Sequence, residues 1–260
     1  MKDKPTLAKE FSDLHIKGDP LIIYNVWDGG SAKTIASCGA KAIATGDHPV
    51  GFAHGFDNTD FDKFTFDIYL PTIVEIASRI GNLPFSVDIN NANGLTGDDL
   101  KERIRTVIQA GAVGINYEDA LTNGGGLNSV EDQAQRIRTI RDAADEMNIP
   151  LFINARSDIF ALSGKEEHAS LLDEAIRRAD AYQTAGANGF FVPGLLDLDL
   201  IGQLTSQVAL PVNIIRLAGA PSTKELAEAG VARVSYGPVP QLAMTEWLKQ
   251  QATAALNGNI

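Results

Sequence analysis

Cysteine and long apolar runs are scarce in this chain, and each absence excludes a class of protein. Cys38 is the only cysteine among 260 residues, which excludes an internal disulfide and a thiolate metal cluster. We expect Cys38 to pack as a small hydrophobe in the first helix. No run approaches the roughly 18 apolar residues of a membrane span. Residues 1–20 are charged and lack the apolar centre of an export signal, so we expect a cytoplasmic protein.

Positive charge is also scarce. The 22 Lys and Arg residues face 33 Asp and Glu residues, giving a net charge of −11. Such a chain repels nucleic acid and anionic lipid, so we expect neither nucleic acid nor a membrane as a partner. A small anionic substrate would need local positive charge. The hydrophobic content of 44%, without a linker or charge block, predicts a single domain over residues 1–260.

Short apolar runs alternate with helical stretches along the whole chain. The helical stretches repeat apolar residues at spacings of three and four, as at Ile73, Ile76, Ala77 and Ile80. Eight runs are predicted as β-strands, at residues 21–26, 41–45, 85–89, 113–118, 151–156, 189–192, 212–216 and 233–236. Strands that alternate with helices predict a parallel sheet with helices on its faces.

Eight such units match the (β/α)₈ TIM barrel, which has roughly 250 residues. Glycines near the helix ends, including Gly39 and Gly111, support the units because glycine readily takes the left-handed conformation that ends a helix. The alternative fold is an open doubly wound sheet. It is less well supported because no G-x-G-x-x-G motif follows Val26.

The carboxyl ends of the strands are where a barrel of this kind builds its active site. Polar residues collect at these ends. They are Asn25, Trp27 and Asp28; Gly46, Asp47 and His48; Asp88, Asn90 and Asn91; Glu118 and Asp119; Asn154, Arg156 and Asp158; and Asn213 and Arg216. Carboxylates dominate one side of this rim and two arginines lie on the other.

Asp88 and Glu118 end neighbouring strands, so their carboxylates can converge. Oxygen ligands with open positions for water suit Mg²⁺ or Mn²⁺, and a buried carboxylate pair is unfavourable without a compensating cation. We therefore expect a metal site at Asp88 and Glu118. The alternative is that each acid only pairs with a neighbouring Lys or Arg.

The two arginines of the rim are candidate substrate ligands. Arg156 offers a planar fork of donors for a carboxylate or phosphonate, although an internal salt bridge to Glu118 or Asp158 is the alternative. Arg216 has the two possibilities in equal measure. Trp27 and Asn213 are further candidates for substrate contacts because they lie at the same rim.

The sequence lacks the catalytic residues that several other classes of enzyme require. No predicted strand ends in lysine, as a Schiff-base enzyme would need, and no G-x-S-x-G motif offers a hydrolase serine. The four histidines lack the spacing of a zinc site. Only His48 lies at the rim, where we expect a loop residue more than a base.

The segment 123–126 (NGGG) follows the fourth predicted strand. It lacks the Gly-Lys-Ser/Thr of a phosphate-binding loop, and three consecutive glycines disfavour a stiff helix. We expect a mobile lid that excludes water from a reactive intermediate, with a merely flexible connection as the alternative.

Eight segments together resemble the isocitrate lyase/phosphoenolpyruvate mutase superfamily. They keep their order from about residue 25 to 238: 25–32 (NVWDGGSA), 42–45 (AIAT), 86–88 (SVD), 111–119 (GAVGINYED), 152–156 (FINAR), 186–194 (GANGFFVPG), 218–222 (AGAPS) and 230–235 (GVARVS). The resemblance implies a (β/α)₈ barrel, commonly a homotetramer, whose eighth helix is exchanged between paired subunits. It also implies a Mg²⁺ ion that holds a 2-oxo acid or enolate while a C–C or P–C bond breaks or forms.

Position by position, the resemblance assigns roles to several residues of the rim. Asp88 and Glu118 match the metal-site acids, and Arg156 matches the substrate-binding arginine. Residues 46–48, Gly46, Asp47 and His48, match the turn that binds the carboxylate and the oxyanion, and Asn123 with its neighbours matches the gating loop.

Three departures from the family pattern matter. Asn90 stands where a second metal-site acid is expected, and Asn58 stands where phosphonomutases carry an acid, although Asp57 or Asp60 could replace it with a slight shift. The gating loop, 120–127 (ALTNGGGL), lacks the Lys-Lys-Cys-Gly-His motif whose cysteine acts in isocitrate and methylisocitrate cleavage.

Without that thiol, a decarboxylase could still take the enolate proton from water. The sequence therefore favours a Mg²⁺-dependent carbon–carbon lyase or decarboxylase that acts on a small 2-oxo or 2-hydroxy dicarboxylic acid through an enolate. Arg156 would hold the distal carboxylate, amides near Gly46 and Asp47 would form an oxyanion hole, and Thr122 or Asn123 would orient the leaving group or a water. The alternatives are phosphonopyruvate hydrolase or mutase chemistry, and a non-catalytic protein that binds oxo acids.

Overall fold

Eight parallel strands form the centre of the molecule. A computed structural model describes residues 2–122 and 124–258. The strands are β1 Leu21–Ile23, β2 Ile43–Ala44, β3 Phe85–Asp88, β4 Gly114–Glu118, β5 Phe152–Arg156, β6 Gly189–Phe191, β7 Val212–Ile215 and β8 Arg233–Ser235. Each lies within one of the eight predicted runs, so the predicted number and order of strands are confirmed.

Ladder hydrogen bonds join the strands in the order β1-β8-β7-β6-β5-β4-β3-β2. A single parallel bridge between Val26 and Thr45 then connects the chain after β1 with the chain after β2, where the Val26 amide donates to the Ala44 carbonyl at 3.0 Å. The sheet is therefore a nearly closed (β/α)₈ TIM barrel. The alternative of an open doubly wound sheet is wrong.

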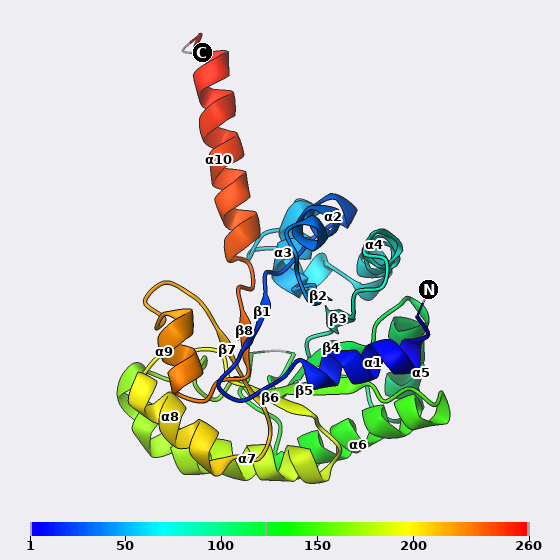
Figure 1. Cartoon of the computed structure of the whole chain (residues 1–260), viewed down its shortest axis with the longest axis vertical. Helices are drawn as coiled ribbons and strands as arrows, with labels where there is room; N and C mark the ends of the chain where they lie inside the picture. The colour runs from blue at the N-terminus through cyan, green and yellow to red at the C-terminus, as the bar shows by residue number, and fades with distance from the viewer. Residues whose placement is uncertain (1, 123, 259–260) are drawn as a thin grey trace.

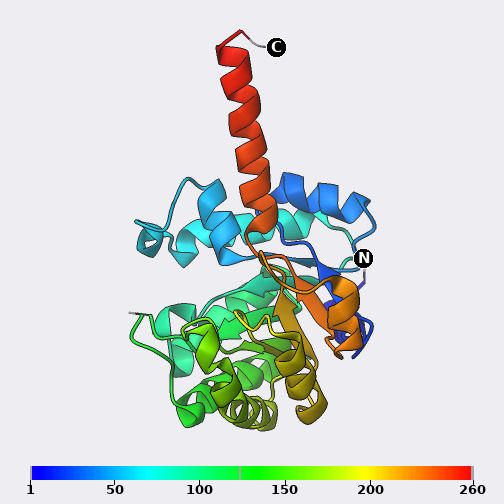
Figure 2. The ribbon, with the colours of Figure 1, turned by 90° about the vertical axis from the view of Figure 1, so that its left-hand side faces the viewer.

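Helices cover the outside of the sheet between successive strands (Figures 1 and 2). The α-helices are α1 Lys4–Asp13, α2 Gly29–Ser37, α3 Asp47–Ala53, α4 Phe66–Arg79, α5 Gly97–Gln109, α6 Val130–Glu146, α7 Leu172–Thr184, α8 Leu198–Gln207, α9 Thr223–Glu228 and α10 Val239–Leu256. Three 3₁₀ segments are η1 Phe61–Lys63, η2 Ala92–Gly94 and η3 Lys165–Leu171. Among the described residues, no helix is long and apolar enough to cross a membrane.

The helix α10 does not lie against the barrel. Figures 1 and 2 both show it pointing away from the other elements toward the C-terminus. Only Pro240 and Gln241 of this helix are buried. Trp247 and Leu248 are about three-fifths exposed, at 60% and 58%, although an apolar side chain is normally buried against another element. The side chains of Ile22 in β1 and of Tyr24, just after this strand, are also exposed.

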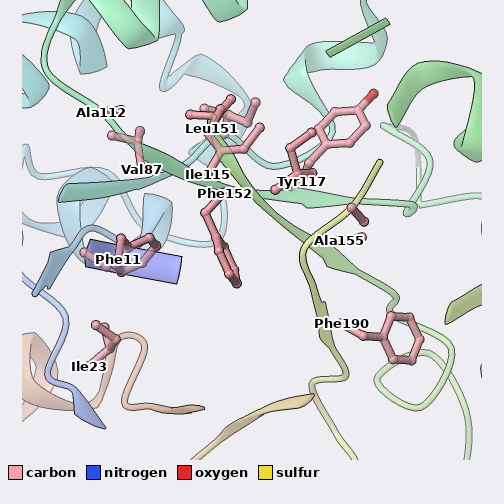
Figure 3. Packing of buried hydrophobic residues seen from close by; sticks show 14 of the residues in the cluster. Phe11, Ile23, Val87, Ala112, Ile115, Tyr117, Leu151, Phe152, Ala155 and Phe190 are labelled. Atoms are coloured by element: carbon pink, nitrogen blue, oxygen red, sulfur yellow. The ribbon is translucent and has the colours of Figure 1, made fainter. Parts of the chain in front are cut away.

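Aromatic side chains fill the amino end of the barrel, with the buried His15 and Arg233 beside them. Phe11 of α1 packs edge-on against Phe152, with ring centroids 5.3 Å apart, and Figure 3 shows these two side chains among the buried core. A Cβ atom on Gly114 would come within 2.5 Å of the Phe11 ring, so this position of β4 admits only glycine. Helix α1 thus closes the amino end of the barrel.

Cys38 is exposed at the C-cap of α2. The expectation of a packed thiol is therefore wrong. The helix ends at Ser37, and its last turn lies at the surface, where the sequence pattern alone did not place it.

Candidate active site

A cavity of about 350 Å³ opens at the carboxyl ends of β2, β3 and β4. This volume lies within the range of roughly 300–1,000 Å³ typical of pockets for small organic ligands. Five of the predicted site residues line it, namely Asp47, Asp88, Asn90, Glu118 and Thr122. The rim predicted from the strand ends therefore contains a real cavity.

Asp88 is the last residue of β3 and points into the barrel from its floor. One carboxylate oxygen accepts from the Asn116 side chain at 3.2 Å, and Asn116 in turn accepts from the Asn154 side chain at 2.9 Å. These side chains meet because Asp88, Asn116 and Asn154 are register partners on β3, β4 and β5. Burial, together with the nearby Asp47 charge, raises the pKa of Asp88 to about 6.

Asn90 links the two predicted metal-site acids through its backbone. Its amide donates to Asp88 Oδ1 at 3.1 Å, and its carbonyl accepts from the Glu118 amide at 3.0 Å. Asn90 has a φ of 50°, and Ala92 and Asn93 have φ values of 52° and 57°. Non-glycine residues take this left-handed region rarely, and such strain concentrates at functional sites. The strained turn after β3 therefore fixes Asp88 and Glu118 relative to each other.

Glu118 ends β4 beside Arg156 of β5, its register partner. Arg156 Nη1 lies 2.9 Å from the Glu118 carboxylate, and Nε and Nη2 donate to the two oxygens of Asp158 at 2.6 and 2.8 Å. Burial alone would lower the pKa of Arg156, but the Glu118 and Asp158 charges outweigh it and raise the pKa. The internal salt bridge considered for Arg156 is therefore present, and two of the five guanidinium N–H groups donate to Asp158 while Nη1 is ion-paired with Glu118.

The charge balance of Glu118 remains unfavourable despite that pair. Burial raises the pKa of Glu118 against the opposing effect of Arg156, and together with the carboxylates of Asp158, Asp88 and Asp47 it brings this pKa to about 8. The cavity floor thus holds more ionisable acid than the one guanidinium can neutralise.

A buried clamp holds the chain after β5 from behind. Asp119, which is fully buried, accepts from the Asp158 amide at 3.0 Å, from Arg178 Nη1 at 3.0 Å and from the Tyr182 hydroxyl at 2.8 Å. The clamp fixes the main chain at Asp158, and Asp158 holds Arg156. Sequence analysis placed Asp119 at the rim without this role, because its partners come from α7, far away in the sequence.

Asp47 and His48 begin α3, directly after Gly46. His48 Nδ1 lies 2.9 Å from Asp47 Oδ1, and the His48 ring stacks on Phe61 with centroids 4.4 Å apart. Burial by itself would raise the pKa of Asp47, but the hydrogen bond from His48 and its charge outweigh it and lower the pKa. The other Asp47 oxygen is buried without a hydrogen-bond partner in the described part of the chain.

The predicted lid is a short antiparallel turn over the cavity edge. Ala120 and Leu127 form a bridge, and the Leu121 amide donates to the Gly126 carbonyl at 2.8 Å. Thr122 accepts from the Asn91 side chain at 3.2 Å, which ties the turn to the loop after β3. Asn123, the other predicted lid residue, lies outside the described residues, and lid motion stays a prediction.

The remaining predicted substrate ligands lie outside the wall of this cavity. Trp27 is buried, with its amide donating to Ser31 Oγ. Asn213 is buried inside the barrel, where it accepts from Ser235. Arg216 donates to the Tyr236 hydroxyl at 3.0 Å. Their roles stay predictions.

Sequence analysis missed two features of the wall, an aromatic segment and one arginine. Phe61, Phe64, Phe66 and Tyr69 line the cavity from η1 and the start of α4, and Arg103 lines it from α5. The density of aromatic residues between residues 52 and 69 was the available signal. The sequence contains no signal that places Arg103 in the cavity wall, because arginines on helices are mostly solvent-exposed.

The donor set fits a hard divalent cation. Among the described residues, no group of three or more Asp, Glu, His or Cys side chains could enclose a metal ion by itself. Mg²⁺ commonly uses one or two carboxylates and completes its shell with water and substrate oxygens. Asp88 and Glu118 would supply the two carboxylates. The unpartnered oxygen of Asp47 and the raised pKa values of both acids agree with missing positive charge at this point.

Comparison with known proteins gives consistent matches over nearly the whole chain. The family model described as phosphoenolpyruvate phosphomutase matches residues 11–256. 2-Methylisocitrate lyase of Escherichia coli K12 is 29% identical over 240 residues, which cover 88% of this chain and 77% of that protein. Oxaloacetate decarboxylase of Pseudomonas entomophila L48 is 28% identical over 242 residues, covering 87% and 77%. The crystal structure of a protein assigned as a phosphonomutase from Burkholderia cenocepacia J2315 superposes with a TM-score of 0.91 at 40% identity, covering 98% of this chain and 100% of that one.

Proposed function

Because this chain belongs to the phosphoenolpyruvate phosphomutase family, we propose that it is a Mg²⁺- or Mn²⁺-dependent carbon–carbon lyase or decarboxylase. Its substrate would be a small 2-oxo or 2-hydroxy dicarboxylic acid. The observation that carries the proposal is the pair Asp88 and Glu118, buried on the cavity floor and joined through the backbone of Asn90. The identity to a methylisocitrate lyase and an oxaloacetate decarboxylase supports this reaction class.

The proposed roles follow from where charge develops. Cleavage beside a 2-oxo group leaves an enolate, whose oxygen carries the new negative charge. A divalent cation supplies Lewis-acid stabilisation when bound, and Asp88 and Glu118 are the residues that would hold it, with the Asn90 amide oxygen as a neutral neighbour. The amides near Gly46 and Asp47 are proposed to bind the oxyanion.

Arg156 is proposed to orient Glu118 and to contact the substrate acid. Two of its N–H groups donate to Asp158, and Nη1 is ion-paired with Glu118, so part of the guanidinium stays available to a ligand. Thr122 and Asn123 of the lid are proposed to orient the leaving group or a water. His48, Trp27, Asn213 and Arg216 remain proposed substrate contacts.

The second candidate is P–C bond chemistry, as in phosphonopyruvate hydrolysis or mutase action. The 40% identity to the Burkholderia protein assigned as a phosphonomutase favours it. Against it, Asn58 stands where phosphonomutases carry an acid. The third candidate, a non-catalytic protein that binds oxo acids, is motivated by Asn90, which removes one charge from the metal site.

An assembly of several subunits is part of the proposal. The apolar side chains Leu242, Trp247 and Leu248 of α10 are exposed, and so are Ile22 of β1 and Tyr24 just after it. We propose that α10 is exchanged with a second copy, in a dimer or tetramer, which would bury both surfaces.

The decisive experiment is a substrate panel with the purified protein and Mg²⁺. Oxaloacetate, alkylated malates, methylisocitrate and phosphonopyruvate are offered, and pyruvate, glyoxylate and phosphate are followed separately. Pyruvate or another oxo acid from a carbon substrate supports the lyase or decarboxylase. Phosphate release selects P–C chemistry, and no turnover with retained oxalate binding selects the binding protein.

The metal site is tested in parallel by calorimetric titration of Mg²⁺ and Mn²⁺ in the presence of oxalate. Asp88→Asn is expected to abolish both activity and divalent binding. Asp142→Asn, at an exposed position of α6, makes the same change of charge and is expected to alter neither. Equal binding by the wild type and Asp88→Asn would refute the assignment of the metal site.

A further inference from the structure

The cavity that would take an anionic substrate is itself strongly acidic. Among the described residues, its wall contains the carboxylates Asp47, Asp62, Asp88 and Glu118, and one guanidinium, that of Arg103. Arg156 lies behind Glu118 and is not part of the wall. A metal ion would neutralise charge at the floor. A second negative group on the substrate, further out, would meet repulsion everywhere except near Arg103.

Arg103 is held so that its donors remain available to a ligand. Its guanidinium carbon lies 3.7 Å above the centre of the Phe66 ring, and its recorded hydrogen bond is a long one of 3.5 Å from Nη1 to Asn93 Oδ1. No carboxylate of the described residues lies within salt-bridge distance of it. A guanidinium that stacks by its face keeps its N–H groups in the plane, along its edge. Stacking on Phe66 therefore holds the guanidinium of Arg103 in place without occupying its N–H donors.

Arg105, two residues along the same helix, shows the ordinary arrangement. Its Nη1 lies 3.3 Å from Glu102, and its Nη2 lies 2.6 Å from Glu146. Neither Arg105 nor its partners line the cavity. Arg103 and Arg105 thus share charge, helix and neighbourhood but differ in ion pairing and in access to the cavity.

An apolar wall lies on one side of the same cavity. Phe61 and Phe64 have ring centroids 5.6 Å apart, and Phe64 and Tyr69 have centroids 5.5 Å apart. The Phe61 ring packs directly against the backbone of Gly51, because a Cβ atom at Gly51 would lie only 2.4 Å from the ring. The rings carry no charged group. A ligand that extends along them would therefore contact apolar ring atoms along its middle and a polar group only at its end.

We propose that Arg103 binds the second carboxylate of a dianionic substrate whose 2-oxo acid end lies at Asp88 and Glu118. The inference rests on the proposed function and assigns its distal substrate contact to Arg103 in place of Arg156. Arg156 is already bonded to Glu118 and Asp158 and is left to orient Glu118. A bidentate guanidinium–carboxylate pair is both strong and directional, so Arg103 selects dicarboxylic over monocarboxylic oxo acids of equal length.

The test compares two acids that differ only at that end, 2-oxoglutarate and 2-oxovalerate. Each is titrated calorimetrically into the Mg²⁺-loaded protein, with oxalate as a short ligand that occupies only the floor. Wild type is compared with Arg103→Met, which keeps the apolar stem over Phe66, and with Arg103→Lys, which keeps the charge without the fork. Arg105→Met is the matched control for charge and helix position.

Arg103→Met is expected to weaken 2-oxoglutarate binding at least tenfold and to leave 2-oxovalerate and oxalate within about twofold of wild type. Arg103→Lys is expected to lie between the two, and Arg105→Met to match wild type. Equal loss for both five-carbon acids, no loss, or the same loss in Arg105→Met would overturn the role of Arg103. If wild type binds not even oxalate, the proposed function itself fails, which is a distinct result.

Discussion

The amino end of the barrel contains a histidine that makes the fold sensitive to acid. His15 stacks on Phe152 with ring centroids 4.0 Å apart, and its Nδ1 donates to the Phe11 carbonyl at 2.8 Å. Its other ring nitrogen is buried without a partner among the described residues. Burial, together with the positive charge of the buried Arg233, lowers the pKa of His15 to about 3. The folded protein therefore keeps this imidazole neutral.

The sign and the size of the effect follow from proton linkage. The pKa is about 3 in the folded state against 6.5 in the unfolded chain, so between these values the unfolded chain binds more protons. His15 therefore contributes stability above pH 6.5 that is lost as the pH falls. Each unit is worth about 1.4 kcal/mol, so about 2 kcal/mol is lost by pH 5 and up to about 5 kcal/mol near pH 3.

The substitution that isolates this effect is His15→Phe, which keeps a ring against Phe152. It removes the Nδ1 hydrogen bond, worth about 1 kcal/mol at every pH, but nothing at residue 15 can then bind a proton. We expect the stability difference between wild type and variant to shift by about 2 kcal/mol in favour of the variant between pH 7.5 and 5. Other titrating groups cancel in this difference.

Urea unfolding followed by tryptophan fluorescence at pH 7.5, 6.5, 5.5 and 5.0 measures it. The same substitution at His54, which is exposed, is the matched control. A wild-type curve that stays parallel to the His15→Phe curve over this range would refute the argument, because it would mean that the imidazole is protonated in the folded state as readily as in the unfolded chain.

Three further predictions concern the clamp, the lid and α10. Asp119→Ala should lower the free energy of unfolding by about 3 kcal/mol, because it removes the buried carboxylate that accepts from Arg178 and Tyr182 and leaves Arg178 only its ion pair with Glu174; a loss below about 1 kcal/mol in urea unfolding would count against the clamp. Gly126→Ala places a side chain at a φ of 113° and should reduce turnover more than Mg²⁺ affinity, since Asp88 and Glu118 do not need the lid; equal effects in kinetics and calorimetry would contradict a separate lid. Trp247→Glu on α10 should lower the molar mass measured by light scattering, whereas Trp247→Phe should not; unchanged mass in both would exclude this face from assembly.

The strands and the acid pair could be predicted from the sequence because both depend on local order. A strand of a parallel barrel is a short apolar run, and its carboxyl end is simply the next residue in the chain. Asp88 and Glu118 were therefore found from position alone, and the structure places both in one cavity wall.

The partners of these residues could not be predicted in the same way. The bonds from Arg156 to Glu118 and Asp158 were only one of two alternatives, since the choice depends on strand register. The bonds of Asp119 to Arg178 and Tyr182 depend on how α7 packs behind β4. Arg103 lines the cavity because α5 places it against Phe66 at the start of α4. The apolar periodicity within α5 does not predict this contact between two helices.

The crowding of acids on the cavity floor affects the stability of the folded protein. Because burial raises the pKa values of Asp88 and Glu118 to about 6 and about 8, their ionised forms oppose folding at neutral pH, and the fold gains stability as the pH falls through those values. The residues proposed to perform the chemistry are thus among those that strain the empty protein. Neutral replacements such as Asp88→Asn would be inactive yet more heat-resistant. A search for thermostable variants that does not measure activity would therefore select substitutions that inactivate the site.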